Sequence, residues 1–482
     1  MKKGIAFIEA LCLVLLLSGC QSMVYERAKF VPSASQIRAG TTAPMADEAV
    51  DDTLQAILCF PDRKFERLVR VSRTITLRSD QPRESAVLQA LLEGPRDTEE
   101  GTWPEVYGGE DAVIDRSCGI LTVNLVPRYR QLTPKELYAV RMAVAETLGQ
   151  LPGVQGVVVL VGGREEGVDL AASMPAGLFR ESNDNDILGK YNLIEELRQG
   201  QSSVIVPAVM YLPDSSRTML LAQSQTLELG NVTPVGILYN VLEHYHTRDI
   251  PGPLRYLQQM PDIQRTEDGG YRLISLHFTR ELREALSAAG ISDGLYMGML
   301  TLTLMEFVPG VDGVSFVIGN REVTEVTLPD GKNLGLQRGF ATYNDFRRLL
   351  GDEMTVYLPE NGRLRRELQV VTAGTDSTRT RLYRVLSGSG LAGESDLRGT
   401  RMERTAIVVN LSEELLQKLR TLNEQAVRAA VYAMVNSLTE GHKQQKVIFF
   451  FDGKQVDTLG GLSMRGSLMR NPGMVEDVRE SQ

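Results

Sequence analysis

Thr147 to Gly163 reads TLGQLPGVQGVVVLVGG, and Thr303 to Asn320 reads TLMEFVPGVDGVSFVIGN. The two segments share Thr-Leu, Pro-Gly-Val and Gly-Val, with one residue inserted in the second. Each joins the end of an apolar helix to a buried strand, and each strand ends in a dipeptide suited to the positive φ angles of a primed turn. Self-similarity at this separation indicates an internal repeat.

A third copy of the same ending is Val447 to Phe451 followed by Asp452-Gly453. Working outward, each copy opens with an apolar strand closed by a proline and an acid, at Leu58 to Asp62, Met210 to Asp214 and Val356 to Glu360. Because proline lacks an N–H, it ends ladder pairing. A second strand follows around residues 68–77, 219–229 and 364–371.

The rest of each copy alternates helix and strand. Apolar residues at three- and four-residue spacing predict a short helix near Val87, Ile237 and Leu382, and a longer helix before the closing strand. Between them lies an alternating strand in which Asn124, His277 or Asn410 is expected to face away from the core. The pattern predicts an α+β protein of three tandem units.

The first 20 residues have the anatomy of an export signal. Lys2 and Lys3 precede an apolar run from Ile5 to Leu17, which ends at Leu17-Ser18-Gly19-Cys20. This ending resembles the lipobox of bacterial lipoproteins, which implies diacylation of Cys20 and export to the outer face of the cell membrane. An ordinary secretory signal with a chance cysteine is the alternative interpretation.

The composition disfavours several classes of protein. With 482 residues, 43% hydrophobic and 23% charged, the chain is typical of a protein with several soluble domains. A net charge of -9 disfavours nucleic acid as a partner. With only four cysteines, a disulfide-stapled scaffold is not expected, although Cys59 and Cys118 could pair in an exported protein.

Motifs for chemistry are scarce. The chain lacks a nucleophile elbow, a His-Glu-x-x-His motif and a P-loop. His244 and His246 lie two apart, so they do not share a helix face. Asp184, Asp186, Gly189 and Glu195 partly match a calcium loop, but Leu188 stands where an oxygen ligand is needed. We therefore assign no catalytic residue, no metal site and no cofactor.

Several segments carry a family resemblance. Ala86 to Pro95 (AVLQALLEGP), Val123 to Leu125 and Val157 to Arg164 (VVVLVGGR) resemble the GerMN domain of bacterial sporulation and germination lipoproteins. Val408 to Leu415 (VVNLSEEL) and Phe449 to Lys454 (FFFDGK) repeat that pattern in copy three. Copy two departs from it. The resemblance implies a fold similar to the ring-building motif and structural work in a protein assembly or in envelope remodelling.

These observations set the expectations for the whole chain. The expected parts are a signal peptide (1–19), a flexible tether (20–52), GerMN-like units at 53–180, 203–330 (degenerate) and 350–468, and a polar tail (469–482). The expected function is a non-enzymatic envelope scaffold in sporulation or germination. Its expected partners are the membrane, through lipidated Cys20, and envelope or sporulation proteins, with an oligomer or ring as a further possibility.

The alternative is an envelope lipoprotein enzyme or a ligand-binding protein acting on peptidoglycan or a small solute. Such a protein needs a polar cleft with convergent groups. Two or more buried titratable groups in a cleft between units would favour it.

Overall fold

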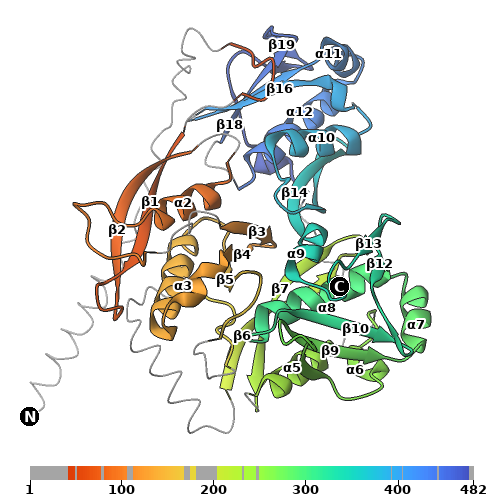
Figure 1. Cartoon of the computed structure of the whole chain (residues 1–482). Helices are drawn as coiled ribbons and strands as arrows, with labels where there is room; N and C mark the ends of the chain where they lie inside the picture. Colours follow the sequence, from red (N-terminus) through yellow and green to blue (C-terminus); the bar gives the residue numbers. More distant parts are fainter. Residues whose placement is uncertain are drawn as a thin grey trace, which may run out of the picture. The chain divides into compact units, whose positions relative to one another are not determined.

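The computed structural model describes residues 42–48, 52–77, 81–105, 112–167, 174–180, 204–230, 233–245, 249–391, 393–403, 405–441 and 445–476. Within them the expected α+β architecture is present, and the same order of elements occurs three times (Figure 1). Each unit has a long two-stranded hairpin, a short helix, a long helix and a small mixed sheet.

Unit one follows this order. Its elements are β1 Asp52–Pro61, β2 Leu68–Leu77, α2 Arg83–Leu92, β3 Val113–Ser117, β4 Ile120–Leu125, η1 Pro127–Gln131, α3 Pro134–Leu148 and β5 Gly156–Val161. β1 and β2 pair antiparallel from Asp52 with Leu77 to Pro61 with Leu68. β4 lies between antiparallel β3 and parallel β5.

Unit two repeats the order and adds short elements. They are β6 Val204–Pro213, β7 Leu220–Leu229, α5 Pro234–Glu243, α6 Pro253–Tyr256, β8 Asp262–Arg265, β9 Arg272–Phe278, α7 Glu281–Ala289, α8 Asp293–Phe307, β10 Gly313–Ile318 and β11 Arg321–Glu322. The connection to unit three contains β12 Glu325–Thr327, β13 Asn333–Gly335, α9 Tyr343–Phe346 and η2 Arg347–Leu349.

Unit three begins directly after that connection. Its elements are β14 Gly351–Glu360, β15 Arg363–Thr372, α10 Thr378–Gly388, η3 Glu394–Asp396, β16 Leu397–Met402, β17 Ile407–Leu411, α11 Glu413–Arg420, α12 Glu424–Thr439, β18 Lys446–Phe451, β19 Thr458–Leu459, β20 Leu462–Ser463, β21 Leu468–Met469 and η4 Pro472–Met474. Val475 bridges to Leu364, so the polar tail is packed against β15 as far as Glu476.

The closing turns have the predicted backbone. Both residues of every dipeptide have positive φ: 60° and 80° at Gly162-Gly163, 55° and 68° at Gly319-Asn320, and 39° and 81° at Asp452-Gly453. These are the angles of a type I′ turn, which matches the right-handed twist of the strands it joins.

The long helices begin at capped residues. Thr133 accepts a hydrogen bond from the Glu136 N–H, Ser292 from the Leu295 N–H, and Asn423 from the Ala426 N–H. A side-chain oxygen at this position satisfies one of the backbone donors left free at a helix start. The caps therefore set the start of α3, α8 and α12 just ahead of the apolar stripes seen in the sequence.

Units one and two share a hydrophobic core. Tyr138 and Met142 of α3 and Leu160 of β5 lie in one buried cluster with residues of β6 and α8. The core of unit three, from Met354 to Met464, is separate. Units one and two are therefore joined by apolar packing, whereas unit three has a core of its own.

The polar residue of β17 faces away from the helix-covered core, as expected, but it is covered from the other side. Asn410 lies on the sheet face opposite the helices, yet it is fully buried. The reason is that Ala43–Glu48, part of the segment assigned to the tether, lies against this face: the Asn410 amide donates to the Pro44 carbonyl at 2.9 Å.

Candidate functional site

Several sequence-predicted residues lie outside the described residues. They are Cys20, the calcium-like series from Asp184 to Glu195, and His246. His244 ends α5, where its Nδ1 lies 2.8 Å from the Asn240 carbonyl oxygen. Among the residues that the structure describes, there is no cluster of three potential metal ligands. These residues also include no helix that is long and apolar enough to cross a membrane.

The two cysteines left open by the sequence are unpaired. Cys59 is buried and Cys118 is half-buried, and both are free thiols. Burial raises the pKa of both thiols, and the nearby carboxylates of Glu353 and Asp352 add to the effect at Cys118, whose pKa reaches about 12. A thiol with a raised pKa is a weak nucleophile at neutral pH.

The most heavily connected polar junction is centred on β3. Asp115 accepts the Tyr343 hydroxyl at 2.9 Å and the Arg347 guanidinium at 2.7 Å. Two residues on, the Ser117 hydroxyl donates to the Gly351 carbonyl at 2.6 Å and accepts from the Ala222 N–H at 2.9 Å. The short strand β3 of unit one thus contacts unit two, the connection between units two and three, and the first residue of unit three.

The start of unit three is tied to the same strand. The Cys118 N–H donates to Asp352 at 2.7 Å, and the Arg116 guanidinium lies 3.4 Å from the other Asp352 oxygen. Burial raises the pKa of Asp352, although Arg116 and the backbone N–H groups oppose this effect. The hydrogen-bonding groups of the junction are therefore largely satisfied by one another.

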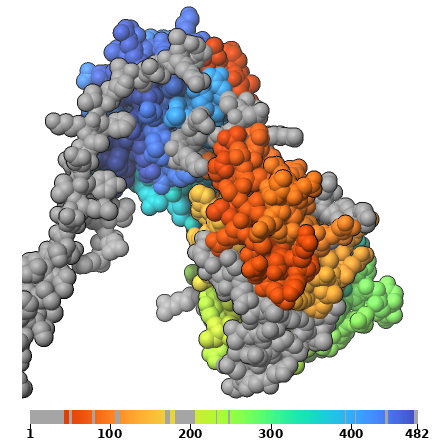
Figure 2. Space-filling view, turned by 90° about the vertical axis from the view of Figure 1, so that its left-hand side faces the viewer, coloured from red at the N-terminus to blue at the C-terminus, as the bar shows by residue number. Residues whose placement is uncertain are grey.

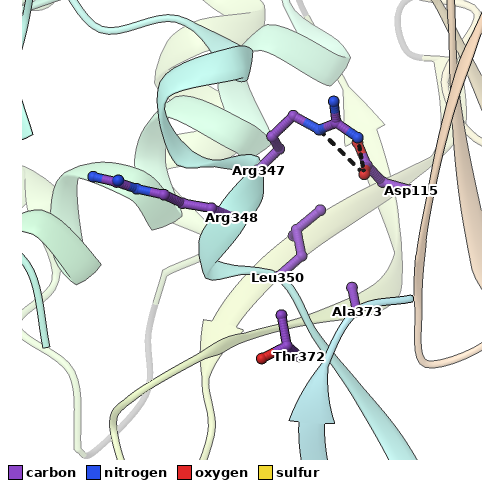
Figure 3. Close-up of a pocket in the computed structure, with 6 residues that line it drawn as sticks. All are labelled: Asp115, Arg347, Arg348, Leu350, Thr372 and Ala373. Atoms are coloured by element: carbon purple, nitrogen blue, oxygen red, sulfur yellow. Dashed lines mark hydrogen bonds and ion pairs between the residues drawn. The ribbon is translucent and has the colours of Figure 1, made fainter. Parts of the chain in front are cut away.

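A pocket of about 330 Å³ opens beside this junction. Its lining consists of Asp115, Arg347, Arg348, Leu350, Thr372 and Ala373. Figure 3 shows Arg347 turned toward Asp115 and Arg348 extended away from it, so the two guanidinium groups do not converge. Because Arg347 already pairs with Asp115, that carboxylate is poorly placed to act as a general base.

A second cluster of ionisable groups is closed inside the shared core. Glu306 of α8 is buried, and its Oε1 accepts the Tyr211 hydroxyl at 2.7 Å and the Thr122 hydroxyl at 2.8 Å. Its Oε2 has no partner within the part of the chain that the structure describes. Burial raises the pKa of Glu306 to about 8, so the carboxyl is largely protonated at neutral pH.

A buried ion pair completes the contact between units one and two. The Arg141 guanidinium donates to both Glu165 oxygens, at 2.7 and 2.6 Å, and to the Gly167 carbonyl at 2.9 Å. The backbone N–H of Glu165 donates to the Met305 carbonyl of α8. The pair therefore fixes the segment after β5 against the long helix of unit two.

The hairpin residues have structural partners. The Gly163 N–H donates to Asn124 at 2.7 Å, and the Gly453 N–H donates to Asn410 at 3.0 Å. In unit two the equivalent His277 instead lies 2.9 Å from the Ser275 hydroxyl. The basic residues after the turns differ: Arg164 pairs with Glu166 and with Asp312, whereas Arg321 and Lys454 are exposed.

Sequence reasoning missed Asp115, Glu306 and Arg141. A signal existed for two of them, because Glu306 is the one charged residue after Asp293 in an otherwise apolar helix, and Arg141 interrupts the apolar run of α3. A charge on a helix that is apolar all round is expected to be buried with a partner. Asp115 had no such signal, because VIDRS lacks alternation.

The Germane family, described as sporulation and spore germination, matches residues 57–167 and 355–457. The two matched segments together span 214 of the 482 residues. They lie within units one and three, and the match does not include unit two, which differs from the family pattern at Glu243 to Tyr245 and at Leu276 to Phe278.

Two solved structures are similar to parts of the chain. One shows the tandem GerMN domains of the sporulation protein GerM from Bacillus subtilis, at 17% identity and a TM-score of 0.21, covering 56% of this chain and all of that one. The other is described as a lipoprotein from Clostridium perfringens, at 18% identity and a TM-score of 0.17, covering 27% of this chain and 87% of that one. The curated proteins include no match.

Proposed function

We propose that this chain is a lipid-anchored, non-enzymatic scaffold of the bacterial envelope that acts in sporulation or germination. The observation that carries the proposal is the Germane match within two units of a three-unit array. Exported tandem units with exposed hairpins and helices offer several contacts at once, and linked weak contacts bind by avidity.

The chemistry of the unit contacts supports this proposal over the enzymatic alternative. Titratable groups do lie between units, as that alternative requires. Glu306 and the Arg141–Glu165 pair are closed within packing, however, and a substrate cannot reach a fully buried carboxyl without separating the units. Asp115 borders a pocket but is held by Arg347 and Tyr343.

Anchoring at Cys20 is part of the proposal. The sequence Leu17-Ser18-Gly19-Cys20 supports it, and two acyl chains on one cysteine supply the apolar area needed for stable membrane residence. The partners we propose are the membrane and proteins of the envelope or of the sporulation machinery. An oligomeric or ring arrangement of this chain would suit the same role.

The deciding experiment compares a point substitution with removal of a unit in the parent bacterium. Asp115→Asn keeps the size of the strongest candidate catalytic group and removes its charge, whereas a deletion of residues 353–476 removes the separate core of unit three. With protein level controlled, we expect heat-resistant spore counts to be kept by Asp115→Asn and lost in the deletion. Loss of spores in a stable, normally abundant Asp115→Asn protein would instead favour an enzyme or a ligand-binding protein.

A further inference from the structure

Residues Ala43–Glu48 lie along unit three and contact residues about 350 positions further along the chain. The Glu48 N–H donates to the Thr400 carbonyl at 2.8 Å, and Glu48 forms a parallel bridge with Arg401 of β16. In Figure 1 and Figure 2 this red segment lies against the blue of unit three. It extends the edge of the unit-three sheet in the manner of an added strand.

Side chains make the contact specific. Asp47 Oδ1 accepts the Thr400 N–H and hydroxyl, both at 2.9 Å, and the Arg379 guanidinium lies 3.5 Å from its other oxygen. Glu48 pairs with Arg401 at 2.8 Å. Two successive acids thus meet two arginines, which fixes the register of the segment.

The apolar part of the segment covers the open face of the sheet. Ala43 packs on a cluster of buried residues formed by Ala406, Val408, Ile448 and Phe450. A Cβ at Gly399 would lie 2.4 Å from the Ala46 carbonyl oxygen. The backbone of the segment therefore approaches β16 as closely as glycine allows.

The same segment leads directly into unit one. Three residues separate Glu48 from Asp52, where β1 begins. Four peptide steps span at most about 14 Å, so a docked Glu48 holds the start of β1 within that distance of β16. Unit three is thereby attached to the rest of the protein at two places, by this segment and by the junction around Gly351 and Asp352.

We propose that Ala43–Glu48 is a latch, a segment whose docking on β16 sets the orientation of unit three relative to units one and two. Unit three has its own core, so among the described residues its orientation depends on this segment and on the junction around Gly351 and Asp352. Ion pairs that water reaches on one side, such as Asp47–Arg379 and Glu48–Arg401, are individually weak, so a latch that relies on them can open without unfolding either side. The latch is argued from contacts within the structure and does not depend on the proposed function. Only a mechanical link between the latch and a membrane anchor at Cys20 would rest on that function.

The first experiment tests the contact in the full chain. Cys12→Ala, Cys20→Ser, Cys59→Ala and Cys118→Ser remove all four native cysteines, and Glu48→Cys with Arg401→Cys places a thiol on each side of the bridge. We expect rapid intramolecular disulfide formation. The control pair is Glu48→Cys with Lys418→Cys, on exposed α11, and we expect it to stay reduced. Equal cross-linking of both pairs, or of neither, would overturn the docking.

The second experiment tests the orientation. In the same cysteine-free background, spin labels at exposed Arg63 and Arg420 report the distance between unit one and unit three. Gly399→Ala should displace the latch, while Gly335→Ala, in a strand with no atom within 4 Å of the added Cβ, should not. We expect one narrow distance for the unmodified latch and for Gly335→Ala, and a broadened or shifted distance for Gly399→Ala.

A second variant distinguishes displacement of the latch from damage that Gly399→Ala could cause to unit three itself. Asp47→Ala with Glu48→Ala removes the acids of the latch without altering β16, and it should broaden the distance in the same way. Its control is Asp457→Ala, which breaks an ion pair with Arg465 elsewhere in unit three. An unchanged narrow distance in both latch variants, or a distance already broad in the unmodified protein, would refute the proposal. Because Cys20 is already replaced in this background, a failure of membrane anchoring would not be mistaken for a failure of the latch.

Discussion

Glu306→Gln should stabilise this protein at neutral pH. The folded protein holds a protonated carboxyl with a pKa of about 8, raised chiefly by burial, against an ordinary value of 4.5 in the unfolded chain. Between these two values the folded state binds a proton that the unfolded state lacks, so the free energy of unfolding falls as pH rises. Glutamine has nearly the same shape and carries no charge, so the variant should lack this dependence.

The size of the effect follows from the two pKa values. Each pH unit within the window changes the free energy of unfolding by about 1.4 kcal/mol. At pH 7 the proton taken up on folding costs the unmodified protein about 3 kcal/mol, since pH 7 lies some 2.5 units above the unfolded pKa. The advantage of Glu306→Gln should therefore be about 3 kcal/mol at pH 7 and close to zero at pH 4.5.

Urea unfolding at pH 5 and pH 7.5 measures this difference. The single tryptophan, Trp103, packs edge-on against Phe60 in unit one, so its fluorescence reports the unfolding of the units that share a core. Glu99→Gln is a control without this pH dependence, because hydrogen bonding to Arg73 lowers the pKa of Glu99 below its ordinary value of 4.5. Its stability contribution is therefore the same at pH 5 and pH 7.5 and is lost only at lower pH, as pH falls through the folded pKa. Identical pH dependence in the Glu306→Gln and unmodified proteins would refute the reasoning.

Three further predictions concern separate parts of the chain. Cys20→Ser should move the protein from the membrane to the soluble fraction, and full retention after a high-salt wash would contradict lipid anchoring. A fragment of residues 350–476 should unfold cooperatively on heating, because the core of unit three contains no residue of units one or two among those described; a gradual melt would contradict this. Arg141→Met should lower the free energy of unfolding by about 3–5 kcal/mol by leaving Glu165 buried and unpaired, and Glu165→Gln added to it should recover part of the loss in the same urea assay.

The sequence by itself determined the repeated part of the fold. Short-range signals carry it: caps such as Thr133, three- and four-residue apolar spacing in the helices, and dipeptides such as Asp452-Gly453 that favour positive φ. Each depends on residues a few positions apart, so it can be recognised in one dimension. The edge strands β3 and β8 were not predicted. Polar segments such as VIDRS and DIQR become strands only by pairing with β4 and β9.

Only the tertiary structure decided how the units meet. The shared core of units one and two, the closed environment of Glu306 and the docking of Ala43–Glu48 join residues far apart in the sequence. Asp47 and Thr400, for example, are 353 positions apart. No local pattern marks such a pair, because its stability comes from the position that the rest of the fold imposes on both residues. The sequence therefore specified what each unit is, and long-range packing specified which of its faces remain open.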